Sequence, residues 1–103
     1  MIKLKDSSVS VSQITPGLLL ALIVADQVYT QYGYDCTVTS GNDAKHSETS
    51  LHYNNDAIDL RTRHLPEGVA QLIVDEIKAR LNKDFDVILE SDHIHLEKQP
   101  RRR

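Results

Sequence analysis

A capped apolar segment near the N-terminus constrains the fold of this chain more than any other feature. Thr15 is a typical helix N-cap, Pro16 suits the first helical position, and Gly33 ends the pattern. The run from Leu18 to Tyr29 is apolar over a wide face, which predicts a helix buried in the centre of the domain. Because 103 residues allow only one modest core, the other elements must pack around this helix.

The remaining segments predict a second helix and several short strands. The second helix opens at Pro66-Glu67, spans Val69 to Leu81 and carries apolar residues at helical spacing: Val69, Leu72, Ile73, Ile77 and Leu81. Alternating or β-prone patterns predict strands at residues 34–39, 57–61, 85–89 and 93–98, with residues 3–13 as an edge strand or arm. We predict a single α+β domain spanning residues 1–103, with two helices on a largely antiparallel sheet and 99–103 as a disordered tail.

Alternation also predicts which strand residues share a face. Ile58 and Leu60 point to the core, while Ala57, Asp59 and Arg61 point to the other side. In the last strand, Ile94 and Leu96 point to the core, opposite to a polar set: His93, His95 and Glu97.

Composition excludes several classes of protein. A net charge of −3 gives no reason to expect binding to nucleic acid. The single cysteine, Cys36, rules out an intramolecular disulfide and is expected in the core. The chain shows neither a signal peptide nor an apolar run long enough to span a bilayer, so we expect it to be made in the cytoplasm without membrane insertion. We also expect a monomer.

Histidine and aspartate residues form the pattern that points to chemistry. His52 precedes Asp59 with six residues between them, and the pair His93 and His95 follows far downstream at strand spacing. Two neutral imidazoles and one carboxylate make a three-ligand set suited to zinc, with a fourth position open for water.

These residues lie in a longer motif that resembles that of a known enzyme family. The order Ser-x-His-x-x-Gly-x-Ala-x-Asp, then His-x-His, is similar to that of the zinc D-Ala-D-Ala metallopeptidase superfamily, which includes cell-wall carboxypeptidases and phage endolysins. The matching residues are Ser50, His52, Ala57, Asp59, His93 and His95. Asn55 replaces the usual glycine, and asparagine tolerates positive φ better than other non-glycine residues.

A loop before this motif departs from the family pattern. Ser40-Gly41 match the family's Ser-Gly-x-Arg element, but Asp43 stands where its arginine would face the substrate. Lys45 is an alternative cation, and His46 is either a substrate-side residue or an exposed loop histidine. Arg61 is expected to pair with a surface acid, the alternative being contact with a peptide carboxylate.

The resemblance implies a hedgehog/D-Ala-D-Ala-peptidase-like fold and assigns roles. The zinc ligands would be His52, Asp59 and His95, with His93 competing for the third position. The family's general base, an acid three residues before the last ligand, would be Asp92, with Glu90 as the alternative. His93 would hydrogen-bond a developing oxyanion or hold an acid beside the metal.

The function implied is zinc-dependent hydrolysis of a peptide bond in peptidoglycan stems or cross-links, by a phage or prophage protein acting at the bacterial cell wall. The peptidoglycan peptide would be its partner and Zn²⁺ its cofactor. The alternative is a non-catalytic zinc-binding module with a degenerate peptidase site. The sequence leaves open which bond is cut and whether the enzyme is a carboxypeptidase or an endopeptidase.

Overall fold

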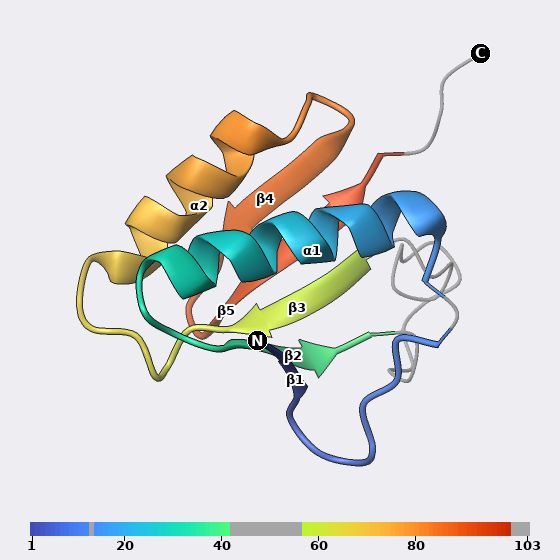
Figure 1. The fold of residues 1–103 in the computed structure, drawn as a ribbon, viewed down its shortest axis with the longest axis horizontal. Coiled ribbons are helices and arrows are strands. Elements are labelled where there is room, and N and C mark those ends of the chain that lie inside the picture. The colour runs from blue at the N-terminus through green and yellow to red at the C-terminus, as the bar shows by residue number, and fades with distance from the viewer. Residues whose placement is uncertain (13, 42–56, 100–103) are drawn as a thin grey trace.

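A five-stranded mixed sheet forms the centre of the domain in a computed structural model that describes residues 1–12, 14–41 and 57–99 (Figure 1). The strands are β1 (Ile2–Leu4), β2 (Cys36–Ser40), β3 (Ala57–Arg61), β4 (Phe85–Leu89) and β5 (His93–Lys98). Their order is β1-β2-β3-β5-β4, with β1 parallel to β2 and the other neighbours antiparallel. The predicted small α+β domain with a largely antiparallel sheet is confirmed.

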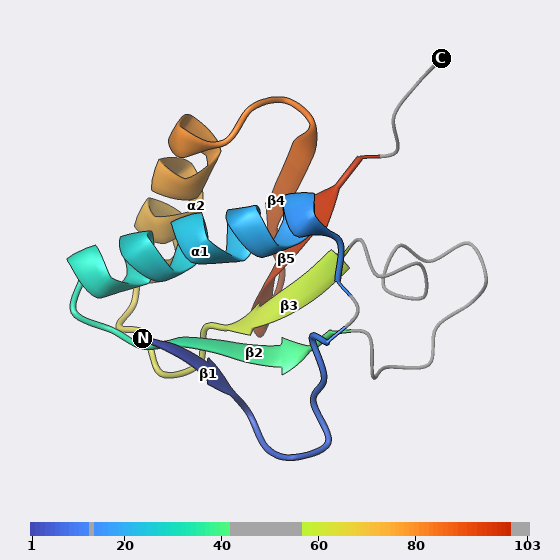
Figure 2. The same cartoon turned by 45° about the vertical axis from the view of Figure 1, so that its right-hand side comes forward.

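Two helices, α1 (Pro16–Gln31) and α2 (Val69–Arg80), cover one face of this sheet (Figure 2). Thr15 caps α1 as predicted, because its hydroxyl accepts a hydrogen bond from the Leu18 amide at 3.2 Å. Gly33 follows the helix at φ 87°, a conformation that glycine adopts without strain. The second helix begins at Val69 as predicted, directly after Gly68, which holds a left-handed φ of 85°, and it ends one residue earlier than predicted, at Arg80.

The core lies between the helices and the sheet. The strands contribute Cys36, Val38, Ile58, Leu60, Val87, Ile94 and Leu96, and the helices contribute Leu18, Leu22, Val28, Tyr29, Ile73, Val74 and Ile77. The predicted core faces of β3 and β5 are therefore confirmed. Their residues are fully buried against the helices, as their alternation requires.

The first helix packs one side of its wide apolar face into the core, while Leu19, Leu20 and Ile23 are 46%, 62% and 41% exposed on its outer side. One prediction about a helix face is wrong. On α2, Leu72 is 51% exposed and Val74 is buried in its place. No helix in the part of the chain that the structure describes is long and apolar enough to cross a membrane.

The opposite face of the sheet carries the polar members of the alternating pattern. Asp59 and Arg61 from β3 and His93, His95 and Glu97 from β5 lie on this face, each half-buried. Within residues 1–12, 14–41 and 57–99, neither helix packs against it (Figure 2). We call it the open face.

Candidate functional site

The centre of the site is a contact between two neighbouring strands. Asp59 and His95 are register partners of β3 and β5, so their side chains leave the sheet side by side on the open face. Asp59 Oδ1 lies 3.0 Å from His95 Nδ1, although 36 positions separate the residues in the sequence. Both side chains are largely buried, with 16% and 17% of their surface exposed. Sheet pairing thus joins two of the three predicted metal ligands.

The His95 ring is fixed from both sides. Its other nitrogen, Nε2, lies 2.6 Å from Glu97 Oε1, one step along the same face of β5. The hydrogen bond to Asp59 raises the pKa of His95 to about 9. Burial of the ring acts in the opposite direction, and the hydrogen bond to Glu97 adds to the increase. A ring held by two carboxylates in this way has a defined orientation. The sequence pattern predicts Glu97 on this face but assigns it no role. The alternation His93-x-His95-x-Glu97 could have indicated that Glu97 lies beside His95.

His93 joins the same cluster one step along β5. Its Nδ1 lies 2.6 Å from Asp92 Oδ1, and its Nε2 lies 3.6 Å from Asp59 Oδ1. Glu90 Oε1 is 3.8 Å from the same Nε2. Asp92 is 79% exposed at the turn that enters β5, whereas Glu90 is 49% exposed. The structure therefore brings the two candidate bases to opposite sides of one imidazole.

The other predicted site residues lie outside the described residues: Ser50, His52, Asn55, Asp43, Lys45 and His46. Among the residues that are described, no group of three or more histidine, cysteine or carboxylate side chains is placed to hold a metal ion. Asp59 and His95 nevertheless fit two positions of a zinc site. They offer a carboxylate and an imidazole from adjacent strands, and the second imidazole nitrogen meets a carboxylate, as is usual for zinc-bound histidine.

A hollow of about 350 Å³ adjoins this cluster on the open face. The described residues that line it are Lys5, Thr39, Asp59, Arg61, Arg63, Asp92 and His93. It thus contains three cationic side chains next to the predicted ligand Asp59 and both members of the Asp92–His93 pair. A substrate in this hollow would touch the residues that carry the predicted chemistry.

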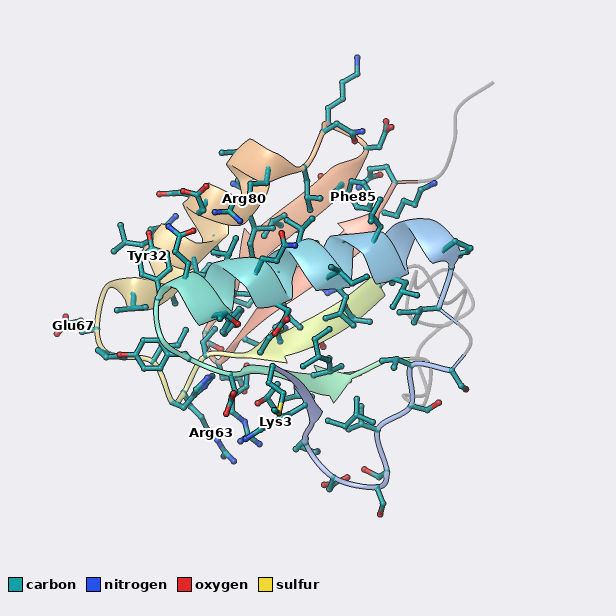
Figure 3. All side chains as sticks on the ribbon, in the orientation of Figure 1. Lys3, Tyr32, Arg63, Glu67, Arg80 and Phe85 are labelled. Atoms are coloured by element: carbon teal, nitrogen blue, oxygen red, sulfur yellow. The ribbon has the colours of Figure 1, made fainter. Side chains whose placement is uncertain are left out.

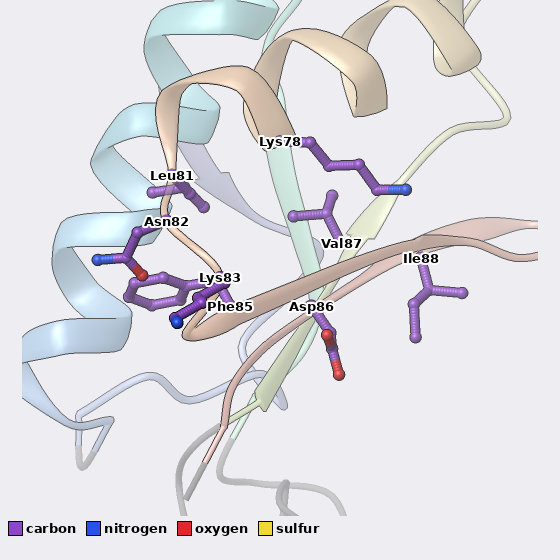
Figure 4. A pocket seen from close by; sticks show the side chains of 8 residues that line it. All are labelled: Lys78, Leu81, Asn82, Lys83, Phe85, Asp86, Val87 and Ile88. Atoms are coloured by element: carbon purple, nitrogen blue, oxygen red, sulfur yellow. The ribbon is translucent and has the colours of Figure 1, made fainter. Parts of the chain in front are cut away.

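A slightly larger hollow, of about 420 Å³, lies between the end of α2 and β4 (Figure 4). Its lining comprises Lys78, Leu81, Asn82, Lys83, Phe85, Asp86, Val87 and Ile88. Apart from the lone carboxylate of Asp86, these residues bring no acid, histidine or cysteine to that hollow. Its size alone does not outweigh the chemistry of the smaller hollow, which we take as the candidate site.

The remaining reactive side chains lie elsewhere. Burial raises the pKa of the Cys36 thiol to about 12, which leaves it unreactive in the core as predicted. His64 is an exposed loop residue that stacks on Tyr29, and its Nε2 lies 3.0 Å from the Asp35 carbonyl oxygen. The predicted exposure of His64 is confirmed.

Comparison of the whole chain with protein-family models finds no match. No curated protein matches it significantly either.

The Asp59–His95 contact predicts a pH dependence for the protein without added metal. Because the folded pKa of His95, about 9, exceeds its ordinary value of 6.5, this contact stabilises the fold fully below pH 6.5. The stabilisation is lost as the pH rises through about 9. Urea unfolding between pH 6 and 9.5 should show this decline, and NMR titration of the imidazole should give the raised pKa directly.

Asp59→Asn and Glu97→Gln are matched variants for this measurement. Both should lower the pKa of His95, and Asp59→Asn should lower it further, because the Asp59 hydrogen bond is the larger cause of the shift. An unchanged His95 pKa in Asp59→Asn would contradict the contact.

Proposed function

We propose that this protein is a zinc-dependent peptidase of the D-Ala-D-Ala type, which hydrolyses a peptide bond in peptidoglycan stems or cross-links. The observation that carries the proposal is the contact between Asp59 and His95. The motif assigns both residues to one metal centre, and the register of β3 with β5 makes them neighbours, as a shared metal centre requires.

The proposed ligands are His52, Asp59 and His95. When bound there, zinc would supply a Lewis acid for the scissile carbonyl and would lower the pKa of water toward neutrality. His95 would bind through Nδ1, the nitrogen beside Asp59, while Nε2–H donates to Glu97. Glu97 would thereby fix the tautomer and the orientation of the ligand.

The proposed general base is Asp92, which would take the proton of the attacking water and pass it to the leaving amine. Its carboxylate already accepts a hydrogen bond from His93. Because an ionised carboxylate can only accept, that bond assigns the ring proton to Nδ1 and leaves Nε2 of a neutral imidazole as an acceptor. Nε2 faces Asp59, so His93 can relay a proton between the reacting water and Asp92.

A protonated His93 would instead donate from Nε2 to the developing oxyanion, which is the other role proposed for it. The two roles use the same geometry and differ only in the number of protons on the ring.

The layout of the domain is compatible with the hedgehog/D-Ala-D-Ala-peptidase-like fold that we propose. Both helices lie on one face of the sheet, and the polar residues of β3 and β5 lie on the other. A role in phage or prophage lysis, at the cell wall, follows from the resemblance alone and is proposed on that ground.

Zinc content and amine release test the proposal together. Purified protein should bind one zinc per chain and release free amines from isolated peptidoglycan, and a chelator should abolish this release until zinc is restored. Zinc binding without amine release would instead identify a non-catalytic zinc-binding module. Failure to bind zinc would identify an α+β binding domain unrelated to the family.

A further inference from the structure

Three cationic side chains surround the hollow beside the Asp59–His93 cluster. Lys5 follows β1, Arg61 ends β3, and Arg63 lies in the loop after it, where its side chain extends away from both helices (Figure 3). The two acids on the same lining, Asp59 and Asp92, each have a histidine within hydrogen-bond distance. Among the described lining residues, three cationic side chains therefore face two carboxylates, each of which already has a histidine partner.

Arg61 occupies a defined place in this arrangement. It is the register partner of His93, and it follows Asp59 by two residues on the same face of β3. Its backbone carbonyl accepts a hydrogen bond of 2.8 Å from the hydroxyl of Tyr29, a fully buried residue of α1. This hydrogen bond anchors the end of β3 to the core, so the Arg61 backbone has a fixed position beside the site.

Neither arginine of the hollow is neutralised by the described part of the protein. Within residues 1–12, 14–41 and 57–99, no carboxylate lies within 4.0 Å of the Arg61 or Arg63 guanidinium. The nearest carboxylate to Lys5 in the described part of the chain is that of Asp6, at 3.9 Å. Elsewhere in the domain, Arg80 lies 3.0 Å from Glu76. The surface acid expected as the partner of Arg61 is therefore not found among these residues.

We propose that Arg61, supported by Lys5 and Arg63, forms a subsite for the terminal carboxylate of a peptide, which makes the enzyme a carboxypeptidase. A guanidinium binds a carboxylate through two parallel hydrogen bonds. The choice of a peptide as the ligand rests on the proposed function, whereas the anion subsite itself rests on the charges and geometry above.

The spacing of the residues selects the end of a peptide. Asp59 and Arg61 leave the strand about 6.7 Å apart, because each strand residue advances the chain by about 3.3–3.4 Å. If the scissile carbonyl lies at Asp59 and His95, one further residue carries the chain about 3.8 Å onward. A terminal carboxylate then falls between Asp59 and Arg61, within reach of the long arginine side chain. A substrate that continued past this residue would bring an uncharged amide to three cations.

Ligand binding tests the subsite without requiring catalysis. The protein as isolated, before metal is added, would be titrated with N-acetyl-D-alanine, its C-terminal amide and inorganic phosphate, followed by amide and guanidinium NMR shifts. We expect N-acetyl-D-alanine to shift signals around Arg61 and to bind more tightly than the other two probes. Arg61→Gln should weaken its binding at least about tenfold, the scale of a charge-assisted hydrogen bond.

Arg80→Gln provides the matched control, because it removes an arginine that pairs with Glu76 on α2, away from the hollow. It should leave the Kd of N-acetyl-D-alanine unchanged. Equal binding of the acid and the amide, or an unchanged Kd in Arg61→Gln, would overturn the subsite. Tighter binding of phosphate than of N-acetyl-D-alanine would overturn its assignment to a peptide carboxylate.

Hydrolysis separates this inference from the proposed function. With zinc bound, kcat/KM should be higher for a peptide acid than for the same peptide as a C-terminal amide, and Arg61→Gln should remove most of that difference. If kcat/KM is equal for the acid and the amide and Arg61→Gln does not change it, the peptidase activity is supported and the subsite is refuted. Arg61-dependent binding of N-acetyl-D-alanine without any hydrolysis would support the subsite and refute the peptidase.

Discussion

Replacing Asp59 or His95 with alanine is expected to remove bound zinc and to reduce amine release from peptidoglycan to background. Each change deletes one of three proposed ligands, and the remaining two donors cannot hold the ion in a tetrahedral site. Glu97→Gln should have a smaller effect and lower the affinity for zinc about 10–100-fold, because it removes only the partner of His95 Nε2. Metal analysis after dialysis, with circular dichroism to verify folding, measures both effects.

His64→Ala serves as the control for removing a histidine from this domain. His64 stacks on Tyr29 in a loop away from the Asp59–His95 contact, so its loss should leave the zinc content unchanged. The comparison that discriminates most sharply is between His93 and His95. If His93→Ala loses zinc while His95→Ala keeps it, the third ligand is His93 and the general base shifts to Glu90. The distances to Asp59 Oδ1, 3.0 Å from His95 and 3.6 Å from His93, favour His95.

Local sequence signals predicted most of the elements of this fold. Thr15 and Pro16 determine where α1 begins, since one satisfies an exposed amide and the other cannot donate a hydrogen bond inside a helix. Alternation predicted β3 at residues 57–61 and β5 at residues 93–98, with the observed boundaries. In these segments a single physical rule, burial of every second residue, decides both the conformation and the face.

Long-range pairing explains what the sequence left open. The edge strand β1 is only Ile2–Leu4, because its bounds depend on parallel pairing with β2 and not on its own mostly polar surroundings. Alternation likewise placed Asp59 and His95 on the open face, but only the register of β3 with β5 makes them neighbours. The exposure of Leu72 shows the same limit, because helical spacing allows several adjacent faces and packing selects one.

The candidate site was also predictable only in part: the motif identifies its residues, whereas their contacts depend on the fold. The motif identified Asp59, His93, His95 and Asp92 as a group, and the described residues bring all four into one cluster. The hydrogen bond from His93 to Asp92 could not be predicted, because it depends on how the turn before β5 directs the exposed Asp92 side chain. The role of Glu97 required the same knowledge of contacts.

Asp92→Asn is expected to lower kcat by about 10²–10⁴-fold while keeping the fold and the metal, because general acid–base assistance typically contributes that much. The amide is nearly isosteric, and its oxygen can still accept the hydrogen bond from His93 Nδ1, so the ring should stay in place. What is lost is a group that can take up a proton. The effect should fall on kcat more than on KM, because the proton moves only in the transition state. Steady-state kinetics with zinc analysis of each sample provides the measurement.

Two further variants decide how Asp92 acts. Glu90→Gln changes the carboxylate on the other side of His93 and should cost far less activity than Asp92→Asn. His93→Gln should cost as much as Asp92→Asn if the proton passes through the imidazole, and clearly less if Asp92 contacts the water directly. With zinc full in every sample, a large loss in Glu90→Gln beside a nearly active Asp92→Asn would reverse the assignment. The base would then be Glu90, and Asp92 would serve only to form the turn into β5, a position that aspartate favours without any catalytic role.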